Sequence, residues 1–306
     1  MSTARTPRTT VLLASTLALG LGLTACSSGG SDAGETTASG DQKSISIGIP
    51  SGWDEGIAVS HLWQAVLEEE GYDVSTDIGE AGVVFTGLAG GDFDVMFDTW
   101  LPQTHAKYVE KYGDQIADLG TWYDDAKLTI AVNEDSPART IADLASMGAD
   151  YDNRLVGIEA GAGLTEATQN EVIPTYGLED MDYVLSSTPA MLSELKSKTE
   201  AGENVAVTLW RPHWAYDAFP VKDLEDPDGA MGEAEKIHTV ARTGFTEDHP
   251  DVSSWISALT LSDEQLFSLE NIMFNENDGT DNDASVREWL EANPTFVDDL
   301  KAAAQA

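Results

Sequence analysis

Three tryptophan residues come directly after segments that the sequence predicts to be β-strands. They lie in the motifs Gly52-Trp53-Asp54-Glu55, Trp100-Leu101-Pro102-Gln103-Thr104-His105 and Trp210-Arg211-Pro212-His213-Trp214. A single tryptophan is most often a packing residue, but three at equivalent strand ends indicate a shared cleft. Indole faces attract cations, and aromatic cages hold quaternary ammonium groups, which cannot donate ordinary hydrogen bonds. The motifs therefore predict a site for an organic cation.

Two other features suit a carboxylate. His105 lies five residues after Trp100, beyond Pro102, so a turn can direct the indole and the imidazole into one pocket. The glycine-rich turn 161–163 leads into a predicted helix, and free backbone N–H groups at the start of a helix bind anions. A ligand with both a cation and a carboxylate would satisfy the two halves of such a site.

Four remaining residues of the motifs are interpreted differently. Asp54 and Glu55 carry charges that favour the positive end of a helix dipole, with a supporting role toward the cation as the alternative. His213 and Trp214 share the third motif, and one of them can support the cage from behind. We leave both outside the predicted ligand contacts.

Four segments together resemble glycine-betaine-binding proteins of osmoprotectant ABC importers. They are Trp53-Asp54-Glu55-Gly56-Ile57-Ala58, Trp100-Leu101-Pro102-Gln103-Thr104-His105, Gly161-Ala162-Gly163-Leu164 and Trp210-Arg211-Pro212-His213-Trp214. The resemblance extends over nearly the whole mature chain, from about Ile45 onward. Some relatives carry the two halves in permuted order, so the match is one of segments.

The resemblance implies an α/β, two-lobed periplasmic-binding-protein fold, type II-like, with the ligand in the cleft between the lobes. It implies that three tryptophans form the aromatic cage: Trp53, Trp100 and Trp210. It further implies that the ligand carboxylate is bound by His105 and by the backbone amides of Gly163 and Leu164. The expected function is capture of glycine betaine, closure of the lobes and delivery to an ABC permease with its ATPase subunits, without enzymatic activity or a cofactor.

The hydrophobic pattern alternates between strands and helices, as in a βα-type sheet. Strands are predicted at 44–49, 72–74, 94–97, 128–132, 155–158, 205–209 and 237–240. Helices are predicted around 59–67, 83–89, 140–144, 255–259, 264–273 and 286–290, and after the turn at 161–163. The length suits two lobes, and we assign 44–132 plus 238–306 to lobe 1 and 133–237 to lobe 2.

The N-terminus has the features of a secretion signal. Arg5 and Arg8 precede an apolar run that is too short to span a bilayer and ends in small residues before Cys26, the only cysteine of the chain. This arrangement resembles the bacterial lipobox and implies a signal peptide at 1–25, lipidation of Cys26 and a flexible tether at 26–43. The expected location is extracytoplasmic, with a lipid anchor in the outer face of the cell membrane. The alternative is an ordinary signal with an incidental cysteine.

Charge and composition exclude several other functions. The chain has 16 basic and 54 acidic residues, a formal net charge of −38, which repels nucleic acid and favours solubility. The five histidines and the single cysteine show no spacing typical of a metal site. We expect a monomer that binds neither metal nor nucleic acid.

Several alternatives stay open within and outside this class. Carnitine and dimethylsulfoniopropionate are possible ligands in place of glycine betaine, whereas choline lacks the carboxylate that His105 and Gly163 would bind. A surface hydrolase of choline esters also uses aromatic cation sites, but it needs an activated nucleophile, and no such motif is found. A regulatory sensor domain is the third alternative, and the lack of a transmembrane signalling segment argues against it.

Overall fold

The computed structural model of the chain describes residues 43–305. The predicted signal peptide, the lipidation site Cys26 and all of the predicted tether except Lys43 lie outside the described residues. Within 43–305, none of the helices has both the length and the apolar character needed to cross a membrane.

The described residues contain a nine-stranded sheet in the order β2-β1-β3-β9-β4-β7-β5-β6, with β8 paired to β4. Its strands are β1 (Ser44–Pro50), β2 (Asp73–Gly79), β3 (Val95–Leu101), β4 (Ile116–Asn133), β5 (Arg154–Val156), β6 (Asp182–Val184), β7 (Ala206–Arg211), β8 (Val221–Asp223) and β9 (Glu235–Arg242). β1 runs parallel to β2 and β3, and β5 runs parallel to β6 and β7. β9 is antiparallel to β3 and β4, and β4 is antiparallel to β7 and β8.

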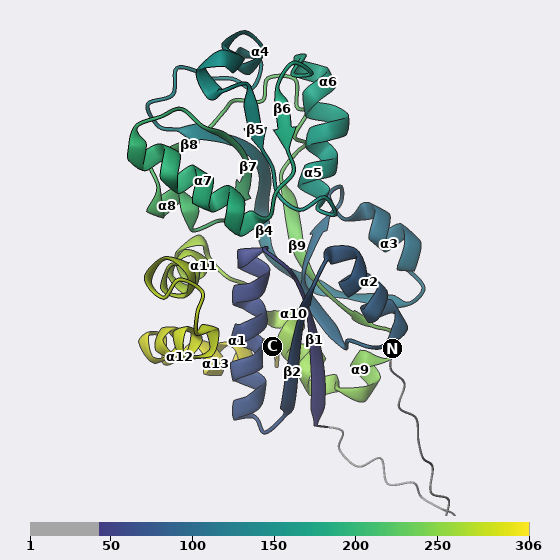
Figure 1. Cartoon of the computed structure of the whole chain (residues 1–306). Helices are drawn as coiled ribbons and strands as arrows, with labels where there is room; N and C mark the ends of the chain where they lie inside the picture. Colours follow the sequence, from purple (N-terminus) through teal and green to yellow (C-terminus); the bar gives the residue numbers. More distant parts are fainter. Residues whose placement is uncertain (1–42, 306) are drawn as a thin grey trace, which may run out of the picture. The chain divides into compact units, whose positions relative to one another are not determined.

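The long strand β4 divides this sheet into two sections. Up to Ala126, which pairs with Glu235, β4 belongs with β9, β3, β1 and β2, and we call this group the first section. From Lys127, which pairs with Arg211, β4 belongs with β7, β8, β5 and β6, which we call the second section. Figure 1 shows the two groups of strands joined through the region of β4 and β9.

The first strand and helix follow from their side-chain patterns. In β1 the alternating residues Ile45, Ile47 and Ile49 are buried, as expected for a strand with one face on a core. The helix α1 (Asp54–Glu69) is buried all round from Asp54 to Ser60, and only its second half buries residues at a spacing of three and four. It ends before Gly71, whose φ of +82° is a left-handed conformation that glycine adopts without steric cost.

The remaining helices cover both sections. They are α2 (Ala81–Gly90), α3 (Ala106–Tyr112), α4 (Asp143–Met147), α5 (Gly163–Ala167), α6 (Ile173–Tyr176), α7 (Thr188–Ala201), α8 (Ala215–Ala218), α9 (Phe245–Asp248), α10 (Pro250–Ala258), α11 (Asp263–Glu270), α12 (Asn282–Ala292) and α13 (Phe296–Ala303). A 3-10 turn (Gly148–Tyr151) and π-helical segments (Thr168–Val172 and Asn271–Glu276) complete the elements. α11 and α12 pack on α1, so the C-terminal segment covers the first section (Figure 1).

The seven predicted strands and the predicted helices are present, with shifted ends. The prediction that each tryptophan comes directly after a strand is wrong, because the strands end at other residues than expected. Trp100 and Trp210 are the last residues but one of β3 and β7, whereas Trp53 is the N-cap residue of α1. The sequence pattern also missed the strands β6 and β8, the first half of β4, and the helices α3, α6, α7, α8, α9 and α13.

Candidate functional site

One pocket contains all six residues that the sequence singled out for ligand contact. It lies where β3, α1 and the turn before α3 face the start of α5 and the end of β7, and it encloses about 290 Å³, counting its opening to solvent. The residues that line it are Trp53, Glu55, Trp100, Thr104, His105, Leu128, Ile158, Ala162, Gly163, Leu164 and Trp210.

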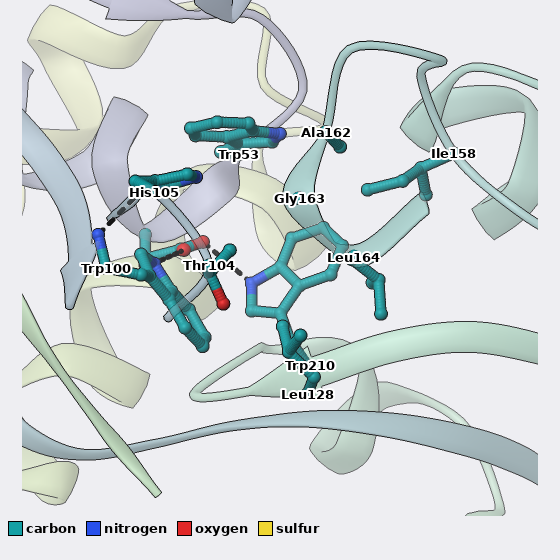
Figure 2. Close-up of a pocket in the computed structure, with 11 residues that line it drawn as sticks. Trp53, Trp100, Thr104, His105, Leu128, Ile158, Ala162, Gly163, Leu164 and Trp210 are labelled. Carbon is teal, nitrogen blue, oxygen red and sulfur yellow. Dashed lines mark hydrogen bonds between the residues drawn. The ribbon is translucent and has the colours of Figure 1, made fainter. Parts of the chain in front are cut away.

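The two sides of the pocket come from the two sections of the sheet. Figure 2 shows Trp53, Trp100, Thr104 and His105 on one side and Ile158, Ala162, Gly163 and Leu164 on the other, with Trp210 and Leu128 completing the wall. Trp210 and Leu128 lie side by side because they are partners in the β4–β7 ladder. The pocket is thus assembled by the fold from segments more than 150 residues apart, such as Glu55 and Trp210.

Trp53 and His105 form one wall of the pocket. Their rings are stacked, with centroids 4.8 Å apart and planes 10° from parallel. Trp53 is buried at the start of α1, and His105 is buried as the N-cap residue of α3. Because the imidazole covers one face of the indole, Trp53 can meet a ligand only through its remaining surface.

Hydrogen bonds fix the orientation and the tautomer of His105. Its backbone N–H donates to the carbonyl oxygen of Trp100 at 3.0 Å, and its Nδ1 accepts the N–H of Trp100 at 2.8 Å. Burial, with a contribution from Lys107, lowers the pKa of His105 to about 3. The imidazole is therefore neutral near pH 7 with its proton on Nε2, which makes Nε2 a hydrogen-bond donor.

Glu55 ties two of the indoles together. Its Oε2 accepts the Nε1–H of Trp210 at 2.8 Å, and its Oε1 accepts the Nε1–H of Trp100 at 3.2 Å. The carboxylate of Asp98 also accepts the Trp100 indole N–H, at 2.9 Å. Glu55 therefore faces the pocket from α1, rather than solvent at the helix start, and it contacts one tryptophan from each section.

The carboxyl groups around the cage lie in a region of low dielectric constant. Burial raises the pKa of Asp98 to about 8 and the pKa of Asp54 to about 7, although indole donors oppose the shift. Burial, with repulsion from Asp98 and Glu270, raises the pKa of Glu55 well above its usual value. Burial also raises the pKa of Glu270, whose two carboxyl oxygens have no hydrogen-bond partner. The protein thus concentrates negative or protonated carboxyl groups behind the aromatic rings.

The opposite wall begins at Gly163, the first residue of α5. No side chain caps this helix start, so backbone N–H groups of its first turn are available to a ligand. A methyl group at Gly163 would lie 2.5 Å from the carbonyl oxygen of Thr104, so only glycine permits this approach. Thr104 is held by Glu235, which accepts its N–H at 3.0 Å and that of Gln103 at 2.7 Å.

His213 and Trp214 follow Trp210 in the third motif and are not among the residues that line the pocket. The His213 ring meets the Trp210 ring edge to face at 4.6 Å. Trp214 donates its indole N–H to Asp54 at 2.6 Å. Burial lowers the pKa of His213 to about 3, so its approach to Asp54 at 3.7 Å is not an ion pair at neutral pH. These two residues thus contact Trp210 and Asp54 by ring packing and by a hydrogen bond.

Five residues of the pocket wall were not predicted as contacts: Glu55, Thr104, Leu128, Ile158 and Ala162. Thr104 and Ala162 lie inside the motifs that resemble the family, so their place in the sequence could have indicated that they line the pocket. Leu128 and Ile158 look like ordinary strand residues, and only the pairing of β4 with β7 and the path after β5 bring them to the pocket. Among residues 43–305, no group of His, Cys, Asp and Glu side chains has the arrangement of a metal site.

The fold and the site together define the family. The profile for the substrate binding domain of ABC-type glycine betaine transport systems, named OpuAC, matches residues 43–292. The chain belongs to this family, as the four sequence motifs predicted. The family is one of transport substrate-binding proteins and not of enzymes.

Known relatives agree with this assignment. The glycine betaine/carnitine transport binding protein GbuC of Listeria monocytogenes is 37% identical over 156 residues, 49% of this chain and 50% of the relative. The match thus spans about half the length of that curated relative. Lactococcal OpuAC, crystallised in its closed conformation with glycine betaine, is 26% identical with a TM-score of 0.77, over 84% of this chain and 98% of that one. The glycine betaine, L-proline-binding protein ProX of Borrelia burgdorferi is 28% identical with a TM-score of 0.77, over 85% and 99%. The predicted two-lobed α/β fold is confirmed by these structures.

Proposed function

We propose that this chain is the extracytoplasmic substrate-binding protein of an ABC importer and that its ligand is glycine betaine. The observation that carries the proposal is the convergence, in one pocket, of three indoles with a neutral histidine donor and an uncapped helix start. The two groups of residues match the two ends of a betaine, which joins a quaternary ammonium group to a carboxylate.

The ammonium group occupies the cage of Trp53, Trp100 and Trp210. A quaternary cation has no N–H to donate, so it gains from the negative faces of aromatic rings and from apolar contact. The buried carboxyl of Glu55 beside the cage adds negative potential. Because the site is desolvated, that attraction is screened less than it would be at the surface.

The carboxylate of the ligand accepts hydrogen bonds from the other half of the pocket. His105 offers Nε2–H, because its Nδ1 is already occupied by the Trp100 amide. Gly163 and Leu164 offer backbone N–H groups at the start of α5. Hydrogen bonds to an ionised acceptor are stronger than those between neutral groups, so this half of the site favours betaines over choline.

Ligand capture is coupled to closure of two lobes, predicted from the sequence at 44–132 plus 238–306 and at 133–237. The strand pairing divides β4 earlier, between Ala126 and Lys127, and puts Glu235 and Ile237 of β9 with the first section. The pocket needs residues from both sections of the sheet, and an ion pair between Lys107 and Glu166 joins α3 to α5 beside it. A ligand that touches both sides binds the closed form better and shifts the population toward it. The closed protein then docks, as a monomer, on the permease, and lipidated Cys26 holds it at the outer face of the membrane.

Titration calorimetry against a panel of ligands tests the proposal. We expect the panel of glycine betaine, proline betaine, carnitine, choline and ectoine to give tightest binding for glycine betaine and weak binding for choline. Binding of choline with equal affinity would show that His105 and the start of α5 do not recognise a carboxylate. Lack of binding by every quaternary ammonium compound would refute the cage.

A neutral analogue separates charge recognition from shape. The compound 3,3-dimethylbutanoate keeps the carboxylate and the shape of glycine betaine but replaces nitrogen by carbon. Each ring that faces a cation contributes about 0.5–2 kcal/mol, so the analogue should bind weaker by roughly one to three orders of magnitude. Equal dissociation constants under the same salt and pH would leave only a shape-selective apolar pocket.

Carnitine is the second candidate ligand. The Listeria relative is named for transport of both glycine betaine and carnitine, and carnitine also joins a quaternary ammonium group to a carboxylate. Its longer spacer separates the two charges further, so a pocket built for glycine betaine discriminates against it. The same calorimetric panel decides between the two ligands.

A further inference from the structure

Two buried carboxyl groups share one hydrogen-bond donor beneath the cage. The indole N–H of Trp100 points to Oδ1 of Asp98 at 2.9 Å and to Oε1 of Glu55 at 3.2 Å. Glu55 and Asp98 have exposed fractions of only 2% and 1%. Two carboxylates at such a site cannot both ionise readily, because each repels the charge of the other in a region that water does not reach.

The surroundings supply no positive charge to either group. Within 43–305, the side chains that shift the titration of Glu55 and Asp98 are carboxyls and indoles, with no lysine or arginine among them. Glu270 on α11 repels the charge of both Glu55 and Asp98, and the neutral His105 lines the same pocket as Glu55. Asp54 precedes Glu55 on α1, and the neutral His213 lies 3.7 Å from Asp54. Apart from a backbone hydrogen bond at Glu55, the donors to the pair are indole N–H groups.

The two carboxyls are not equivalent. Glu55 has a donor for each oxygen, the indoles of Trp100 and Trp210, and it lines the pocket. Asp98 does not line the pocket, and its Oδ2 has no hydrogen-bond partner. That oxygen lies against the backbone of Gly56, where an added methyl group would be 2.2 Å away. Ionisation of both groups would leave an uncompensated negative oxygen packed against α1.

We propose that Glu55 and Asp98 hold one proton between them in the ligand-free protein, and that a quaternary ammonium group entering the cage displaces this proton to solvent. The inference rests on the proposed function, because the incoming cation supplies the positive charge that the pair lacks. The step forms no covalent bond: an O–H of the pair ionises, and water or buffer takes the proton. The ammonium group then lies in the field of two carboxylates, of which only Glu55 lines the pocket.

The proposal predicts the sign of the pH dependence. The raised pKa of Asp98, about 8, places the proton on the pair near neutral pH. The bound cation favours the ionised pair, so binding releases a proton at pH values below about 8 and none well above it. Apparent affinity therefore rises with pH in this window, by at most about tenfold per pH unit for one proton. The carboxylate of the ligand and the neutral His105 do not titrate there. Asp54, whose pKa is about 7, does titrate in this window, so its contribution must be separated by a variant.

Calorimetry of glycine betaine binding in buffers of different ionisation enthalpy measures the proton directly. At about pH 6.5 we expect release of roughly one proton per ligand, falling toward zero by about pH 9. Binding enthalpies that do not depend on the buffer between about pH 6 and pH 8 would overturn the proposal.

Variants identify the groups that hold the proton. In Asp98→Asn the amide oxygen still accepts the Trp100 indole N–H, but no second carboxyl remains, so proton release and the pH dependence of affinity should largely disappear. Glu55→Gln should remove them as well. Asp54→Asn is the matched control, because Asp54 is also buried but bonds Trp214 outside the pocket. It should retain proton release whatever its effect on affinity.

The outcomes separate this inference from the proposed function. Absence of any glycine betaine binding would refute the proposed function itself. Binding without proton release would leave the function standing and overturn the inference about Glu55 and Asp98. Loss of release in Asp54→Asn together with its retention in Asp98→Asn would also overturn it, because the proton would then belong to the wrong carboxyl.

Discussion

Substitution of Gly163 by alanine should block closure of the pocket without unfolding the protein. The added Cβ would lie 2.5 Å from both the carbonyl oxygen and the Cγ2 of Thr104, whereas ordinary contact begins near 3.4 Å. Thr104 cannot retreat easily, because Glu235 accepts its N–H, its hydroxyl and the N–H of Gln103. The two sides of the pocket must then separate by about 1 Å, a distance that matters in a close-packed region.

The size of the effect follows from the cost of overpacking. Inserting one methyl group into a well-packed site costs about 1–3 kcal/mol, and 1.4 kcal/mol corresponds to about tenfold in affinity. Affinity for glycine betaine should therefore fall roughly 5- to 150-fold. The start of a helix accepts alanine well, so the melting temperature of the ligand-free protein should stay close to that of the wild type.

Titration calorimetry and thermal melting, run on the same preparations, measure the two quantities. Gly161→Ala is the matched control, because its Cβ would have no neighbour nearer than an oxygen of Glu80 at 3.8 Å. The reasoning fails if Gly163→Ala binds within about twofold of the wild type. It also fails if Gly161→Ala loses as much affinity, or if the Gly163 variant loses stability rather than affinity.

Three other predictions concern the cage, the anchor and the buried acids. Alanine in place of any one cage tryptophan should weaken betaine binding roughly 2- to 30-fold. Trp255→Ala, on α10 away from the pocket, should mainly lower the melting temperature. A Trp255 variant that melts normally but does not bind would contradict the site. Cys26→Ser should move the protein from the membrane fraction to the soluble fraction with unchanged ligand affinity, and membrane retention would refute lipidation. Glu270→Gln should stabilise the protein more at pH 8 than at pH 5 in urea unfolding. The pKa of Glu270 is raised in the folded state above 4.5, so folding stability is lost as pH rises, and an equal effect at both pH values would argue against this.

The sequence predicted the contacts that depend on local motifs. Trp100 and His105 lie on one turn, so their joint position follows from short-range geometry. Gly163 was singled out by the resemblance to glycine-betaine-binding proteins, with which a glycine-rich turn before a predicted helix is consistent. All of these residues line the pocket that the fold assembles.

The contacts that depend on long-range pairing could not be predicted. From the sequence, Glu55 is a charge at a helix start, where a carboxylate is favoured by the dipole, with a supporting role toward the cation as the alternative. Its actual partners, the indoles of Trp100 and Trp210, are 45 and 155 residues away. The residue that permits this packing is Gly56, whose missing side chain lets α1 approach Asp98. No periodic pattern in the chain contains that information.

The paired hydrogen bonds between Trp100 and His105 have a consequence for ligand length. One ring of the proposed cage and the proposed carboxylate donor belong to a single turn, which is closed by bonds of 2.8 and 3.0 Å. Their separation therefore stays the same whether the lobes are apart or together. For the proposed ligand, this turn therefore sets the distance between the ring that meets the ammonium group and the donor that meets the carboxylate.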